Sequence, residues 1–177
     1  MKLFTRTVAI VLFMSMFIGI QAQAQETKKE KKFVSGNSFN VAFPMGDMES
    51  LYNTGWGIYA NFDYNFSSFL AARFDLGWNS FNGTDLTPDL GLKSASAYEA
   101  PVVTVGNLDV FEFTGGLRAK IAFFYVEARG GYFTGINEWG VVPAVGLRFG
   151  RLDFQGSYTV AGNYQWAGAR VGFYWGR

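Results

Sequence analysis

The stretch GWGIYANFDYNFSSFLAARFDLGWN, residues 55–79, decides the fold class of this chain. Apolar residues take every second position: Trp56, Ile58, Ala60, Phe62, Tyr64 and Phe66, then Leu70, Ala72, Phe74, Leu76 and Trp78. The positions between them carry mostly small, polar or charged residues. Alternation over ten or more residues is typical of strands whose two faces meet different surroundings. The stretch therefore predicts two strands joined by a tight turn at Ser67 and Ser68.

The same alternation recurs from Phe33 to the C-terminus, and no helical period interrupts it. Eight strands are predicted, over residues 33–44, 55–66, 69–80, 108–120, 123–134, 139–149, 152–160 and 165–176. Two-residue turns are expected at 67–68, 121–122 and 150–151, and longer connections over 45–54, 81–107, 135–138 and 161–164. Short turns on one side and longer loops on the other are typical of outer-membrane barrels. The predicted fold is an all-β, eight-stranded antiparallel up-and-down transmembrane β-barrel, with both termini on the periplasmic side.

The first 24 residues have the features of a secretory signal peptide. Lys2 and Arg6 precede an apolar run over residues 7–20, and the sequence QAQA at 21–24 fits a small-residue cleavage site. The apolar run is shorter than the ~20 residues that a membrane-spanning helix needs. Cleavage near Ala24 would leave residues 25–32 as a charged periplasmic linker and residues 33–177 as a barrel in the bacterial outer membrane.

Composition excludes several classes of protein. The chain has no cysteine and no histidine, so disulfides, thiolate metal sites and histidine-dependent catalysis are not expected. Aromatic residues make up 19% and hydrophobic residues 49%, which rules out a disordered chain. A net charge of +1 gives no sign of a nucleic-acid partner. We expect no cofactor and no metal.

Apart from Asp109, near the loop-side end of the fourth predicted strand, the charged residues of the predicted strands lie on the polar parity. They are Asp63, Arg73, Asp75, Glu112, Arg118, Lys120, Glu127, Arg129, Arg148, Asp153 and Arg170. Six are basic and five are acidic, and small residues fill most of the remaining positions. A soluble surface carries about 25–35% charged residues, so this sparse and balanced face suits the packed lumen of a narrow barrel. We therefore predict a lumen charge network.

Apart from Asp109, near the loop-side end of its strand, the opposite parity is free of charge within the predicted strands, as a lipid-facing surface requires. Its aromatic residues are expected at two interfaces with the membrane, because Trp and Tyr gather at the headgroup level. The loop-side group is Trp56, Trp78, Phe111, Tyr132 and Tyr158. The turn-side group is Phe33, Tyr64, Phe66, Phe124, Phe149, Phe173 and Trp175.

With this architecture, the chain resembles the small eight-stranded outer-membrane barrels of the OmpA/OmpX type over residues 33–177. The resemblance implies a monomeric, non-enzymatic barrel without a wide pore, placed among outer-membrane lipid and lipopolysaccharide by the barrel-assembly machinery. Two features depart from it. The chain continues through Gly176 and Arg177 after its last aromatic residue, and Pro143 interrupts the sixth strand. Because proline cannot donate to a ladder, we expect a bulge there or a strand that begins after it.

The role that the sequence favours is structural, or surface interaction with an unidentified extracellular ligand through loops 45–54 and 81–107. A narrow, low-conductance channel through the charged lumen is a second interpretation, and a soluble lipid-binding barrel is a third. Barrel enzymes that process lipid A or peptides use histidine, which this chain lacks. The long connections are acidic, with Lys93 as their one basic residue, but they show no calcium-loop spacing.

Overall fold

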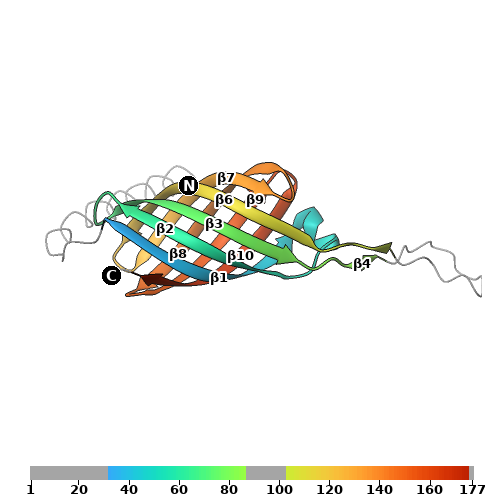
Figure 1. The fold of residues 1–177 in the computed structure, drawn as a ribbon, viewed down its shortest axis with the longest axis horizontal. Coiled ribbons are helices and arrows are strands. Elements are labelled where there is room, and N and C mark those ends of the chain that lie inside the picture. The colour runs from blue at the N-terminus through green and yellow to red at the C-terminus, as the bar shows by residue number, and fades with distance from the viewer. Residues whose placement is uncertain (1–31, 87–102, 176–177) are drawn as a thin grey trace, which may run out of the picture.

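The computed structural model describes residues 32–86 and 103–175, which form eight long strands (Figure 1). These strands are β1 (Phe33–Met45), β2 (Gly55–Asn65), β3 (Leu70–Phe81), β6 (Leu108–Ile121), β7 (Phe124–Thr134), β8 (Glu138–Phe149), β9 (Leu152–Ala161) and β10 (Tyr164–Trp175). Each strand end lies within one residue of its predicted position. The predicted signal peptide, most of the linker, Lys93 and the last two residues lie outside the described residues.

Three short elements accompany the long strands. A 3-10 helix, η1 (Gly46–Ser50), follows β1, and β4 (Asp85–Leu86) pairs with β5 (Val103–Thr104). Within the described ranges, no helix is long and apolar enough to cross a membrane. Figure 1 shows β4 projecting beyond the barrel, past the end of β3.

The eight long strands close into one antiparallel barrel in the order β1-β10-β9-β8-β7-β6-β3-β2. Successive paired residues around the barrel are Ser35, Phe62, Phe74, Gly115, Gly130, Val141, Val160, Gln165 and Met45. The path returns to β1 ten residues beyond its start. That stagger over eight strands corresponds to a strand tilt of about 40° and a backbone radius of about 8 Å. Such a barrel holds only side chains inside, and the predicted fold class is confirmed.

The connections lie at two ends that we name the loop end and the turn end. The loop end carries residues 46–54, 82–107, 135–137 and 162–163, and the turn end carries 66–69, 122–123 and 150–151. Two predicted lengths are wrong. The connection at 161–164 is a two-residue hairpin, because Gly162 adopts a left-handed φ of 57° without strain. The turn at Ser67 and Ser68 spans four residues, closed by the Leu70 amide, which donates to the Ser67 hydroxyl at 3.1 Å.

Pro143 causes neither a bulge nor a new strand start, so that prediction is also wrong. Val141 pairs with Val160 and Ala144 pairs with Ser157 in one unbroken register, while Pro143 itself pairs with Ala128 on the other side. Between these pairs the ladder to β9 is interrupted for two residue pairs, because Pro143 has no amide donor. An extra residue is not needed, because the loss of one donor can be absorbed within a ladder that is paired above and below it.

Candidate functional site

Burial alternates along the long strands, so one set of side chains fills the barrel and the other faces outward. All eleven charged residues expected in the lumen have the inward parity. Ten of them are buried: Asp63, Arg73, Asp75, Glu112, Arg118, Glu127, Arg129, Arg148, Asp153 and Arg170. Lys120, near the turn end, is partly buried, and its ammonium donates to the Asn65 side chain at 2.5 Å.

Asp63 is the centre of the network near the turn end. Its Oδ1 accepts from Arg73 at 3.0 Å, and its Oδ2 accepts from Arg118 at 3.1 Å and from Arg148 at 2.7 Å. These three arginines come from β3, β6 and β8, so one carboxylate links distant parts of the barrel wall. A buried charge needs such partners, because its loss of hydration costs several kcal/mol.

Asp75 is a second centre, in the middle of the lumen. The Nε of Arg73 donates to its Oδ1 at 2.5 Å, and the Nη1 of Arg170 donates to its Oδ2 at 2.7 Å. Arg129 also donates to Asp75 Oδ2. Arg73 therefore bridges the two centres, and its side chain is only 1% exposed.

Glu127 and Asp153 complete the ion pairs. Glu127 accepts from Arg118 at 2.7 Å and pairs with Arg129 at 3.0 Å, and Asp153 accepts from Arg148 at 2.6 Å. Every buried arginine of the lumen thus contacts at least one carboxylate. The arrangement neutralises charge locally, as a dry interior requires.

Three inward tyrosines stack on this network, and the sequence analysis did not assign them to it. The guanidinium carbon of Arg170 lies 3.5 Å from the centre of the Tyr59 ring. Arg118 lies 3.8 Å from the Tyr125 ring, and Arg148 lies 3.8 Å from the Tyr174 ring. Cation–π contacts of this kind strengthen when the site is desolvated. The polar parity of Tyr59, Tyr125 and Tyr174 was the available signal.

Glu112 differs from the other buried carboxylates, because it forms no ion pair with any residue that the structure describes. Its Oε1 accepts from the Tyr59 hydroxyl at 2.7 Å and from the Asn79 amide, both of which are neutral donors. Tyr59 reaches it by lying across Gly77, where an added Cβ would meet the tyrosine ring at 2.1 Å. Glu112 therefore belongs to a polar layer between the ion pairs and the loop end.

An apolar plug closes the lumen at the loop end. It consists of Ala42, Met48, Phe81, Val110, Phe133, Val142, Ala161 and Trp166, all of them buried. Phe81 and Phe133 each meet the Trp166 ring edge-on, with ring centroids 5.6 Å apart. Met48 comes from η1, which folds over the barrel mouth. The sequence analysis missed this plug, although its strand members are apolar residues on the otherwise polar parity.

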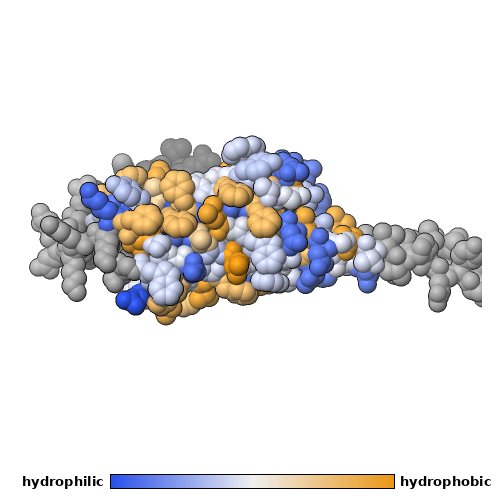
Figure 2. All heavy atoms as spheres, in the orientation of Figure 1, coloured by the Kyte–Doolittle hydropathy of each residue, from blue (hydrophilic) through white to orange (hydrophobic). Residues whose placement is uncertain are grey.

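The outer face is a charge-free apolar belt over the middle of the strands. Figure 2 shows hydrophobic side chains over the barrel body and hydrophilic ones gathered towards the end from which β4 projects. All the predicted interfacial aromatics have the outward parity. At the loop side these are Trp56, Trp78, Phe111, Tyr132 and Tyr158; at the turn side, Phe33, Tyr64, Phe66, Phe124, Phe149, Phe173 and Trp175. Several contact one another, as Trp56 and Trp78 do at a centroid distance of 4.8 Å.

Backbone hydrogen bonds join two connections at the loop end into one surface. The Asn53 amide donates to the Asn82 carbonyl at 2.8 Å, and the Thr84 amide donates to the Leu51 carbonyl at 2.9 Å. Asp47, Glu49 and Asp85 give this surface exposed carboxylates. No group of three potential metal ligands occurs in the part of the chain that the structure describes.

Comparisons with known proteins find relatives in structure only. No protein-family model and no curated protein sequence matches the chain. Ail, the attachment invasion locus protein of Yersinia pestis, was solved in complex with the heparin analogue sucrose octasulfate. It matches 82% of this chain and 100% of its own, with 12% identity and a TM-score of 0.51. A de novo designed transmembrane β-barrel matches 84% of this chain and 100% of its own, with 13% identity and a TM-score of 0.48.

At such low identity, the similarity to Ail concerns the fold. The chain has a closed, eight-stranded antiparallel barrel, and Ail shares this architecture. The resemblance inferred from the alternating sequence is therefore confirmed as one of architecture.

Proposed function

We propose that this protein is an integral β-barrel of a bacterial outer membrane, without enzymatic activity, which displays the 46–54 and 82–107 connections at the cell surface. The observation that carries the proposal is the apolar belt around a barrel whose charges in the middle of the strands are turned inward. A soluble lipid-binding barrel would have the reverse arrangement, with its apolar face inside. Phe74, Val145 and Phe149 are more than half exposed in the belt, an arrangement that suits hydrocarbon.

The lumen supports a structural role. Its arginines are held by carboxylates and tyrosines, and nothing in the network resembles a nucleophile with an adjacent base. We assign surface interaction to the loop end, because a small barrel is a rigid frame on which the connections can vary. We do not expect the loop end of this chain to bind a sulfated ligand such as that of Ail, because it has few basic residues. Between residues 74 and 117 the only basic residue is Lys93, and 46–54 has none.

Cell fractionation with gel mobility tests the proposal. The protein is expected in the outer-membrane fraction, and an unheated sample should migrate differently from a boiled one, because the closed barrel resists detergent until heated. A free periplasmic pool with no such shift would contradict membrane insertion.

The channel interpretation makes a separate prediction. We expect no steady single-channel current from the unmodified protein in planar bilayers, because ion pairs fill the middle of the lumen and the apolar plug closes its loop end. Trp166→Ala should still give no steady current, since the ion pairs beneath the plug remain. A steady, sizeable conductance in the unmodified protein would favour the narrow channel instead.

Topology at the cell surface can be tested with trypsin. Lys93 is the only Lys or Arg between Arg73 and Arg118, and we expect cleavage there in intact cells. Lys93→Gln provides the matched control, which should resist cleavage in this segment. Protection in intact cells, with cleavage only after the outer membrane is broken, would place the loop end in the periplasm.

Loop shortening separates display from folding. Replacing residues 87–102 with a short turn between β4 and β5 retains the hydrogen bonds that join residues 51–53 to 82–84. We expect thermal stability and insertion to change little, because loop-closure free energy varies slowly with length. A large fall in the unfolding temperature would show that this segment stabilises the barrel.

A further inference from the structure

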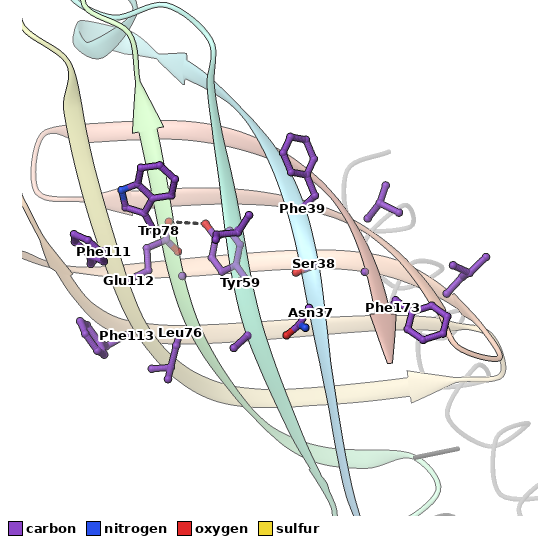
Figure 3. A pocket seen from close by; sticks show the side chains of 16 residues that line it. Asn37, Ser38, Phe39, Tyr59, Leu76, Trp78, Phe111, Glu112, Phe113 and Phe173 are labelled. Carbon is purple, nitrogen blue, oxygen red and sulfur yellow. Dashed lines mark hydrogen bonds between the residues drawn. The ribbon is translucent and has the colours of Figure 1, made fainter. Parts of the chain in front are cut away.

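A groove of about 790 Å³ crosses the outer face of the barrel over β1, β2, β3, β6 and β10 (Figure 3). Two rows of paired residues define it. One row runs through Phe173, Asn37, Ala60, Leu76 and Phe113, and the other through Val171, Phe39, Ile58, Trp78 and Phe111. In the first row, Asn37 and Ala60 carry smaller side chains than Phe173 and Leu76 on either side of them.

Asn37 is a polar residue on an otherwise apolar part of the outer face. It is exposed on the lipid-facing parity of β1, and its side chain makes no hydrogen bond to any other residue that the structure describes. An amide without a partner in hydrocarbon costs several kcal/mol. Its partner must therefore come from outside the part of the chain that the structure describes.

The position of Asn37 limits what that partner can be. Asn37 pairs directly with Phe173 of the turn-side aromatic group, and Phe33 of the same group lies four residues away on β1. The aromatic residues at that end, including Tyr64 and Trp175, mark the level at which lipid headgroups meet acyl chains. The ester carbonyls of a phospholipid lie near this level, and they are acceptors for the Nδ2 donor of an asparagine.

We propose that this groove binds one phospholipid of the turn-side leaflet, with an acyl chain against Ala60 and Leu76 and an ester carbonyl accepting from Asn37. The inference depends on the membrane location proposed above. The shape of the site favours a lipid over a second copy of the chain. A flexible acyl chain fits a concave surface, whereas two identical grooves placed face to face would leave a void between them.

The test uses ester-linked dimyristoylphosphatidylcholine nanodiscs and nanodiscs of its diether analogue, which has the same headgroup but no ester carbonyl. In the ester lipid, the side-chain amide protons of Asn37 should show NOEs to the lipid glycerol and to the first acyl methylenes. Their resonance should move upfield in the diether lipid. The unfolding midpoint of the unmodified protein should fall by about 4 °C in the diether lipid, as expected for the loss of one hydrogen bond.

Asn37→Leu is the matched variant and should show no difference between the two lipids. An unchanged Asn37 resonance in ester and diether lipid would overturn the proposed contact. Failure of the barrel to insert into either lipid would instead contradict the proposed function.

A cross-linking experiment tests whether a second copy of the chain occupies the groove instead of a lipid. The chain has no cysteine, so Asn37→Cys introduces a single thiol, and Val145→Cys offers an exposed control elsewhere on the belt. We expect both variants to cross-link equally weakly in membranes. Selective disulfide dimers of Asn37→Cys would show that the groove meets a second copy and would overturn the lipid proposal.

Discussion

Replacing Asp75 with asparagine is expected to destabilise the barrel by about 3–5 kcal/mol, the usual cost of removing one partner from a buried charge pair. The change preserves side-chain volume but removes the negative charge that Arg73, Arg129 and Arg170 share. These arginines are buried, so water cannot replace the lost carboxylate without opening the wall. The free energy of unfolding should be measured by urea titration of the protein in lipid vesicles.

Glu112→Gln is the matched control. It also converts a buried carboxylate into an amide of the same size, but Glu112 accepts hydrogen bonds only from the neutral groups of Tyr59 and Asn79. No arginine loses an ion pair, and we expect a change of about 1 kcal/mol or less. Equal losses in the two variants would mean that the ion pairs around Asp75 contribute nothing specific.

Val145→Arg on the outer belt is expected to cost about 2–4 kcal/mol, as an arginine does near the bilayer midplane. Val145 is 60% exposed and has no charged neighbour on its strand face. The same substitution on a soluble protein would change stability by no more than about 0.5 kcal/mol. The loss of stability therefore shows whether this face meets hydrocarbon or water. The free energy of unfolding in vesicles measures that loss.

Asn163→Arg serves as the control for Val145→Arg. Asn163 lies in the two-residue hairpin at the loop end and is exposed. We expect almost no change in stability there, because the new charge meets water. If both arginines were tolerated equally, the belt would not face hydrocarbon.

The strands could be predicted from the sequence because alternation is a local property. Residues 55–79 carry the period-two signal themselves, and the structure places those strands within one residue of the expected bounds. Local signals do not determine turn length in the same way. The two-residue hairpin at 162–163 depends on the left-handed φ of Gly162, and the four-residue turn at 66–69 depends on a hydrogen bond to the Ser67 hydroxyl. Pro143 misled the prediction, because one missing donor is a weaker constraint than the register on either side of it.

The inward parity of the charged residues was visible in the sequence, but their partners were not. Asp63 and Arg73 face each other on paired strands, whereas Asp63 and Arg148 meet across the lumen from positions 85 residues apart. Such contacts follow only from barrel closure and the ten-residue stagger. The plug was missed for a different reason. Phe133 and Trp166 lie on the polar parity near the loop end, but the sequence analysis assigned no role to large apolar residues on that parity.

The central claim is that the outer belt faces lipid, and depth-dependent fluorescence quenching tests it most directly. Three single-cysteine variants, Trp78→Cys, Val145→Cys and Trp175→Cys, would each carry a fluorophore in vesicles that contain quenchers at known depths. We predict the strongest quenching of the Val145 site by quenchers near the bilayer centre. The Trp78 and Trp175 sites should respond to shallow quenchers in opposite leaflets. Quenching of the Val145 site by aqueous iodide, without quenching from lipid, would contradict the account.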